Sequence, residues 1–247
     1  MYNPLEQFKI TPIIRIYNEW LDLTITNSTI MMLISVLVIL LITSRDNNII
    51  VNKRERLFEI LYLKIEEILL AMLGGKGKSK YIPLIKNIFL FILLNNIIGL
   101  VPYSFTTTSH IAITLTFSLS IIIAVTFLGF RIHSFSFFNL FIPSGLNKGF
   151  IKMLIPLIFL IEIISYLTRI ISLSVRLTAN MMSGHTLLKI IANFGLKYTL
   201  FKPYIFLLIP LVILIPVLLL ELGVAFIQAY VFTLLTASYI KDAELLH

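Results

Sequence analysis

The sequence contains no cysteine, a single tryptophan and few charges. The absence of cysteine excludes disulfides, thiolate metal sites and a cysteine nucleophile. Charged residues make up only 13% of the 247 residues, about half of the roughly 25% that is usual in soluble domains. Hydrophobic residues make up 58%, and the mean hydropathy is +0.98. This composition predicts an integral membrane protein, because a soluble domain of this length could not bury so much apolar sequence.

The basic residues give a formal net charge of +8 and gather in short segments between apolar runs. This placement is typical of topology signals and of contacts with membrane lipids. No basic stripe with interleaved aromatic residues is present, so no nucleic acid is expected as a partner. No cluster of histidine and carboxylate residues has metal-ligand spacing, and no cofactor is expected.

We expect an all-α fold of about five membrane helices and one amphipathic surface helix. The first span is short against the ~20 residues that a membrane crossing needs. Residues 57–72 place apolar side chains on one helical face and charges on the other, as in a helix that lies along a membrane surface. The chain then divides into an N-terminal segment, a first transmembrane helix, an inside loop that holds the surface helix, and a helical channel domain, at residues 1–27, 28–44, 45–82 and 83–247.

Two smaller features of the channel region and its preceding loop have ordinary interpretations. The sequence GGKGKS at residues 74–79 lacks the first glycine of a phosphate-binding loop, because Met72 stands there, and no strand precedes it. A basic turn without a nucleotide site is the better interpretation.

Asn95 and Asn96 lie inside the second span, where hydrogen bonding between helices is favoured over a channel role.

Two long apolar stretches follow, at residues 153–193 and 202–240. The first would be ~60 Å long as one helix, about twice the thickness of a hydrocarbon core. It is therefore either two crossings or one strongly tilted helix. The second poses the same choice, and Pro203, Pro210 and Pro216 permit bends near its start. Hydropathy alone leaves both alternatives open.

Polar residues follow one face of the first long stretch. Glu162, Arg169 and Arg176 are spaced by seven residues, and Asn180 and Ser183 follow at plus four and plus seven. At about 100° per residue these positions form one slowly drifting stripe. Lipid penalises such groups unless they face protein or water, so the stripe is a candidate functional site.

The second long stretch carries its own polar face. Gln228 and Asp242 follow Glu221 at plus seven and plus twenty-one, so all three share a helical face. Glu221 and Asp242 would lie ~31 Å apart along an unbroken helix, close to one membrane thickness. Two helices with carboxylates toward different ends indicate a split aqueous path.

The chemistry of these groups suits proton transfer. Arg176 keeps its charge, so a carboxylic acid that approaches it ionises, and the same acid becomes neutral when lipid desolvates it. The chain thus supplies half of a proton-release cycle, and a moving partner must supply the acid. Glu162, and Glu221 with His185, could pass protons to that acid, since histidine titrates near neutral pH.

Four motifs carry a family resemblance: SLSVRLTANMMSGH at 172–185, NNIIGLVPYSFTTTSH at 95–110, NPLEQF at 3–8 and ELGVAFIQAYVFTLLTASYIKD at 221–242. Together they resemble subunit a of the F-type ATP synthase in its mitochondrial form. The likeness covers nearly the whole chain, and the pattern R-L-x-A-N-x-x-[SA]-G-H is highly specific.

The resemblance implies a proton-translocating stator subunit of the mitochondrial inner membrane, without catalytic chemistry of its own. Its implied partners are the c-subunit ring, against which the last two helices lie steeply tilted, the peripheral stalk subunit b and other Fo subunits. Arg176 would separate two half-channels and prevent a direct leak. His185 and Glu221 match one half-channel, and Glu162 and Asp242 match the other. The implied proton pathway comprises Arg176, Glu162, His185, Glu221, Asp242, Asn180, Gln228 and Ser183.

Two other classes of protein remain as alternatives. A stand-alone ion channel or secondary transporter would be supported by inverted repeats, and we find none in the sequence. A purely structural membrane anchor predicts that neutral substitutions along the stripe leave activity intact. For Arg169, a packing role with a snorkelling or ion-paired side chain and a direct role both stay open.

Overall fold

The computed structural model describes nine segments of the chain, and every structural statement here concerns them. They are residues 4–15, 17–18, 21–22, 24–43, 53–74, 80–101, 104–134, 155–199 and 205–245. Five residues of the GGKGKS turn, 75–79, lie outside the described residues, as does most of the loop between the third span and the first long stretch.

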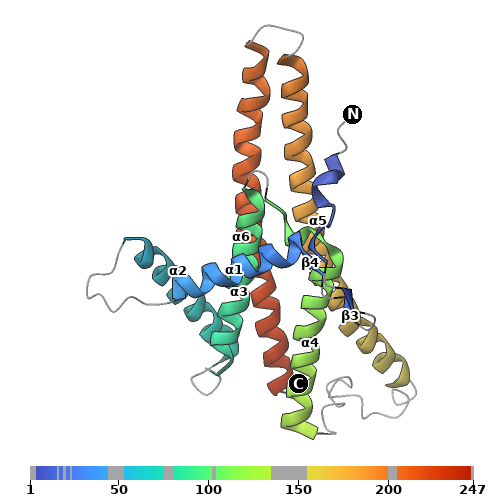
Figure 1. Ribbon diagram of the computed structural model, residues 1–247. Coiled ribbons are helices and arrows are strands. Elements are labelled where there is room, and N and C mark those ends of the chain that lie inside the picture. Colours follow the sequence, from blue (N-terminus) through green and yellow to red (C-terminus); the bar gives the residue numbers. More distant parts are fainter. Residues whose placement is uncertain are drawn as a thin grey trace. The chain divides into compact units, whose positions relative to one another are not determined.

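Six α-helices account for most of the described chain (Figure 1). In order they are α1 (Asn27–Thr43), α2 (Lys53–Leu73), α3 (Ile82–Leu100), α4 (Ile111–His133), α5 (Ile155–Thr199) and α6 (Ile205–Leu245). Two short 3-10 turns, η1 (Pro4–Phe8) and η3 (Thr107–Ser109), precede α1 and α4. The helix α2 contains the predicted amphipathic segment; its position on a membrane surface stays a prediction.

The N-terminal segment contains short strands, which the sequence did not predict. Strand β1 (Pro12–Ile14) pairs antiparallel with β4 (Ile25–Thr26), and β2 (Tyr17–Asn18) pairs with β3 (Leu21–Asp22). The side chain of Asn27 fixes this segment at the start of α1. Its Oδ1 accepts from the Thr11 amide at 3.3 Å, and its Nδ2 donates to the Lys9 carbonyl at 3.3 Å.

The long apolar stretches are each one helix, which answers the question that hydropathy left open. α5 has 45 residues and α6 has 41, and α6 continues through Pro210 and Pro216. A proline inside a membrane helix is tolerated where neighbouring groups satisfy the freed carbonyl. Each helix exceeds the ~20 residues of one upright crossing, which is compatible with a strong tilt; the tilt itself stays a prediction.

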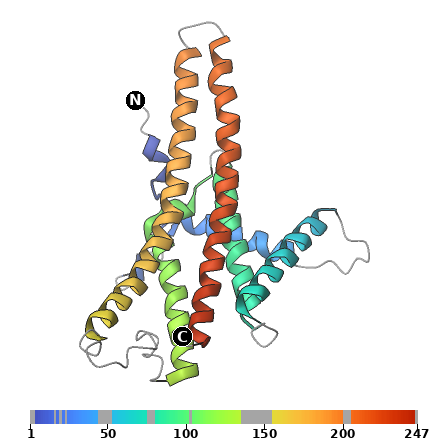
Figure 2. The same cartoon turned by 180° about the vertical axis from the view of Figure 1, so that it is seen from behind.

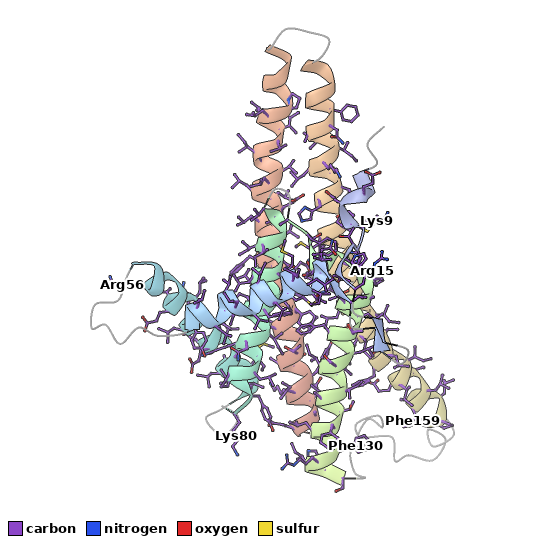
Figure 3. All side chains as sticks on the ribbon, viewed as in Figure 1. Lys9, Arg15, Arg56, Lys80, Phe130 and Phe159 are labelled. Carbon is purple, nitrogen blue, oxygen red and sulfur yellow. The ribbon has the colours of Figure 1, made fainter. Side chains whose placement is uncertain are left out.

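Four helices, α3 to α6, contain segments long and apolar enough to cross a membrane, whereas α1 is a shorter apolar helix of 17 residues. Large apolar side chains stand outward on them, such as Phe130 at the end of α4 (Figure 3). Outward apolar faces on long helices are what lipid contact requires. The predicted class, an all-α integral membrane protein, is confirmed, and whether α1 makes a fifth span stays a prediction.

The contacts divide the chain into two units that interleave along the sequence. The first contact unit comprises residues 1–51, 88–111 and 177–230, and the second comprises residues 52–87, 112–176 and 231–247. α3, α5 and α6 each contribute to both units. The four-part division expected from the sequence is a different kind of division and stays a prediction.

In the first contact unit, the parts of α5 and α6 run side by side in both views (Figures 1 and 2). Gly195 permits a close approach near their shared end, because a Cβ there would lie 3.2 Å from Pro210 Cβ. α3 packs on α6 through the rings of Phe89 and Phe226, whose centroids are 5.9 Å apart. These contacts set which faces of α5 and α6 meet.

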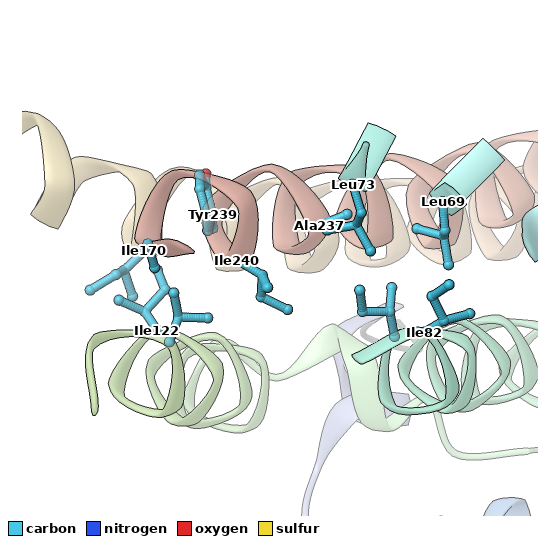
Figure 4. Packing of buried hydrophobic residues seen from close by; sticks show 11 residues of the cluster. Leu69, Leu73, Ile82, Ile122, Ile170, Ala237, Tyr239 and Ile240 are labelled. Carbon is cyan, nitrogen blue, oxygen red and sulfur yellow. The ribbon is translucent and has the colours of Figure 1, made fainter. Parts of the chain in front are cut away.

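The second contact unit has an apolar core shared by five helices (Figure 4). Leu69 and Leu73 of α2 lie close to Ile82 of α3, and Ile122 of α4 lies close to Ile170 of α5. α6 adds a cluster at its C-terminal end. Those residues are Ala237, Tyr239, Ile240 and Ala243.

An ion pair joins α2 to the start of α3 in the second contact unit. The ammonium of Lys86, whose residue is only 3% exposed, donates to the carboxylate of Glu66. The same ammonium lies over the Tyr62 ring, 3.6 Å from its centroid. Burial of a lysine requires such compensation, because an unpaired charge in the interior is costly.

Candidate functional site

The polar stripe of the first long stretch lies on the single helix α5. α5 is unbroken from Ile155 to Thr199, so Glu162, Arg169, Arg176, Asn180 and Ser183 follow one drifting face. The first three belong to the second contact unit and the last two to the first contact unit. The candidate site is therefore described as two groups.

In the second contact unit the two arginines have different surroundings. Arg176 is exposed and makes no hydrogen bond or ion pair with any residue that the structure describes. Arg169 is half-buried, and its guanidinium carbon lies 5.5 Å from the centroid of the Tyr239 ring on α6. This is a cation–π contact.

Two carboxylates of the predicted proton pathway lie in the second contact unit. Glu162 is half-buried on α5 and Asp242 is exposed on α6. Within the described segments, neither forms an ion pair with Arg169 or Arg176. A fixed positive charge on an apolar helix without a carboxylate partner remains available to an acid from outside the chain.

In the first contact unit, Glu221 of α6 is 7% exposed although it lies within an apolar span. Neither carboxylate oxygen has a hydrogen-bond partner among the described residues. The carboxylate lies against α5 at Gly184, where an added Cβ would be 2.7 Å from Oε1. The next residue, His185, has a buried Nε2 that also lacks a partner in the described part of the chain. α5 and α6 thus each bury a polar group that has no hydrogen-bond partner among the described residues.

The amides of α3 contribute buried polar groups to the same unit. Asn96 is fully buried, its Nδ2 donates to the Ala225 carbonyl of α6 at 3.4 Å, and its Oδ1 has no partner among the described residues. Asn95 Nδ2 donates to the Phe91 carbonyl at 2.8 Å, and its Oδ1 accepts from the Thr107 hydroxyl at 3.0 Å. The hydrogen bonding between helices expected for this pair is confirmed for Asn96.

A compact polar turn follows α3. The hydroxyl of Ser104 donates to carbonyls at the end of that helix, and Thr106 Cγ2 would lie 2.5 Å from a Cβ at Gly99. The imidazole of His110 stacks on the Phe105 ring at 5.1 Å. Burial lowers the pKa of His110 below its ordinary value of 6.5, because desolvation disfavours the charged form.

The remaining predicted residues occupy intermediate positions. Asn180 and Gln228 are half-buried, and Ser183 is exposed with its hydroxyl donating to the Asn180 carbonyl at 3.2 Å. Among the described residues, no three histidine, aspartate or glutamate side chains gather as metal ligands. Carboxyl and imidazole groups such as these can bind and release protons.

Sequence reasoning missed two residues of the site. Gly184 is the point at which the Glu221 carboxylate touches α5, and its sequence signal is its fixed place before the histidine in the pattern R-L-x-A-N-x-x-[SA]-G-H. Tyr239 meets Arg169 across two helices. No spacing within one helix could have indicated that contact.

Fold and site together define an integral membrane protein whose longest apolar helices carry ionisable groups, a combination that marks ion or substrate pathways. The family described as ATP synthase A chain matches residues 25–241. The chain is 41% identical over 254 residues to ATP synthase subunit a of Trichophyton rubrum, covering 99% of this chain and 97% of the relative. It is 43% identical over 255 residues to ATP synthase subunit a of Podospora anserina, covering 99% of this chain and 94% of the relative. It is 40% identical over 251 residues to ATP synthase subunit a of Pelagibacter ubique, covering 99% of this chain and 98% of the relative.

The chain therefore belongs to the ATP synthase A chain family. Members of this family are membrane subunits of ATP synthase and not its catalytic chains, so no nucleotide chemistry is assigned to this chain. The resemblance given by the sequence motifs is confirmed.

Proposed function

We propose that this chain is the proton-translocating stator subunit of an F-type ATP synthase in the mitochondrial inner membrane. Its partners are the ring of c subunits, the peripheral stalk subunit b, other Fo subunits and membrane lipids. The single observation that carries this proposal is Arg176, an exposed guanidinium on an apolar helix without a hydrogen-bond or ion-pair partner among the described residues. Family membership supplies the context.

The proton path consists of two half-channels, one for each group of ionisable residues. In one half-channel the Glu221 carboxylate and His185 Nε2 exchange protons with water and with the ring, and Asn180, Ser183 and Gln228 line the way. In the other half-channel Glu162 and Asp242 serve the opposite compartment. The burial of Glu221 supports its role, because an idle carboxyl in an apolar span would be costly.

Arg176 acts as a barrier between the two half-channels. Its guanidinium stays protonated at all physiological pH. A ring carboxylate that reaches it is driven to ionise and releases its proton, and the same carboxylate must regain a proton before it enters lipid. Protons therefore cross only as the ring turns.

The test is Arg176→Ala in membranes that carry the assembled complex. We expect assembly to persist and proton-coupled ATP synthesis to be lost, and Arg176→Lys to fail as well, because a desolvated lysine loses its proton and lacks the planar fork. Potential-driven proton uptake is measured with the ring free and with the ring blocked. Proton uptake that persists with the c-ring blocked and does not depend on Arg176 would favour the alternative of a stand-alone channel or transporter. Normal ATP synthesis in the Arg176→Ala complex would favour the alternative of a purely structural membrane anchor.

A further inference from the structure

The two arginines of the α5 stripe share a face but not an environment. They are seven residues apart, which is about 10.5 Å along a helix axis. Arg169 is half-buried with its guanidinium over the Tyr239 ring, whereas Arg176 is exposed and without a hydrogen bond or ion pair to any described residue. Arg169 therefore has an aromatic contact across two helices, whereas Arg176 has no hydrogen bond or ion pair within the described part of the chain.

The Tyr239 ring is itself held firmly. It is 9% exposed and belongs to the apolar core of the second contact unit, together with Ile170, Ala237 and Ile240 (Figure 4). Tyr166, one turn before Arg169 on α5, packs against the same core. A ring fixed by close packing presents its negative face in one place, so it can fix the position of a guanidinium.

Among the residues that the structure describes, no carboxylate forms an ion pair with Arg169. Glu162 lies on the same face of α5, yet the structure gives no ion pair between it and Arg169 among the described residues. Asp242 on α6 likewise forms no ion pair with Arg169 among the described residues. The cation–π contact of the Tyr239 ring is with Arg169, and the structure gives none between that ring and Arg176.

We propose that Tyr239 is a positioning residue that holds Arg169 against α6 and so leaves Arg176 as the one arginine that meets the ring carboxylate. This inference rests on the proposed function. Two free guanidinium groups two turns apart would each stabilise an ionised carboxylate. The ring of c subunits would then stop with its carboxylate at either of two arginines. The barrier between the half-channels would no longer be a single residue.

The test is a set of variants at Tyr239 and Arg169 in the assembled complex. Tyr239→Leu removes the aromatic face and frees Arg169, and we expect ATP synthesis per complex to fall roughly five- to tenfold, the factor expected for a partly desolvated cation–π contact. Tyr239→Phe keeps the ring face, and its activity stays within about twofold of wild type. The decisive variant is Tyr239→Leu with Arg169→Gln, in which the freed charge is absent and synthesis recovers.

A matched control separates this role from loss of packing. Phe232 is another buried aromatic residue of α6 in the same contact unit, and its ring packs on Phe117 with centroids 5.7 Å apart. Phe232→Leu also creates a cavity but frees no arginine. We therefore expect Arg169→Gln to leave any defect of Phe232→Leu unchanged.

Two outcomes would overturn the inference. If the double variant is as impaired as Tyr239→Leu alone, the tyrosine serves packing only. If Tyr239→Phe is as impaired as Tyr239→Leu, the hydroxyl group and not the ring face is what matters. Arg176→Ala is measured in the same membranes, so that loss of synthesis there shows that the proposed function stands even where the inference about Tyr239 fails.

Discussion

Gly184 leaves room for the carboxylate of Glu221, and this gives a sharp prediction for Gly184→Ala. A Cβ at position 184 would lie 2.7 Å from Glu221 Oε1, 2.9 Å from Cδ and 3.2 Å from Cγ. The first two distances are shorter than real Cβ contacts, so the Glu221 side chain has to move. Because Glu221 is buried, it must move into packed surroundings.

Two opposing contributions set the magnitude. Overpacking of a close-packed site costs typically 1–3 kcal/mol, so about 2 kcal/mol is expected here. Replacing glycine by alanine inside a helix recovers ~1 kcal/mol of helix propensity. The net effect on folding is then only about 1 kcal/mol, which is small against the total stability of a domain. The displacement of the carboxylate, in contrast, acts directly on proton transfer, and we expect synthesis to fall by about tenfold or more, because placement errors of about 1 Å cost that much.

The assay is ATP synthesis per assembled complex in membranes, with the amount of complex measured separately. Gly223→Ala is the matched control, because it makes the same substitution on α6 at a position where a Cβ would meet nothing within 4 Å. We expect Gly223→Ala to assemble and to work as the wild type does. Combining Gly184→Ala with Glu221→Asp shortens the carboxylate by one methylene and should recover part of the lost activity. Equal behaviour of the two alanine variants would refute the reasoning.

Two further predictions concern other parts of the chain. Glu66→Gln leaves the Lys86 ammonium buried without its carboxylate and should destabilise the chain by about 3 kcal/mol, whereas Lys86→Met removes the buried charge and should cost less. Denaturant unfolding in detergent measures both losses of stability. A larger loss for Lys86→Met would contradict this prediction. For His110, whose pKa is lowered by burial, the folded turn binds fewer protons than the unfolded chain, so stability is full above about pH 6.5 and falls as the pH drops below it. The protection of the amides of residues 104–110, which is their exchange rate compared with that of an unfolded chain at the same pH, should therefore fall in acid, and His110→Gln should remove this pH dependence.

The helices were predictable where composition decides them. The residues 57–72 expected as an amphipathic helix lie inside α2 (Lys53–Leu73). Apolar and charged residues that recur with the 3.6-residue period indicate an amphipathic helix. The choice between one helix and two in the long stretches was not predictable. Hydropathy measures apolar content, and a turn inside lipid or protein leaves no reliable mark on it. The strands β2 and β3, with two residues each, are too short for an alternating pattern.

The candidate site was predictable along each helix but not across helices. Spacing by sevens placed Glu162 and Arg176 on one face, because that argument needs only the 3.6-residue period. The contacts of Gly184 with Glu221 and of Arg169 with Tyr239 depend on how α5 and α6 are rotated about their own axes. That rotation is set by the packing of many side chains, and no local pattern in the sequence specifies it.

The Lys86–Glu66 pair also constrains how the chain enters the membrane during synthesis. Lys86 is the fifth residue of α3. An unpaired ammonium adds ~2.5–3.5 kcal/mol to insertion at the centre of a membrane helix and less near its end, where the side chain can reach the interface. Its counter-charge stands on the preceding helix α2, which leaves the ribosome first. We therefore expect α3 to insert most readily once α2 has folded and the carboxylate of Glu66 can pair with Lys86. The order in which α2 and α3 are synthesised then affects how α3 inserts into the membrane.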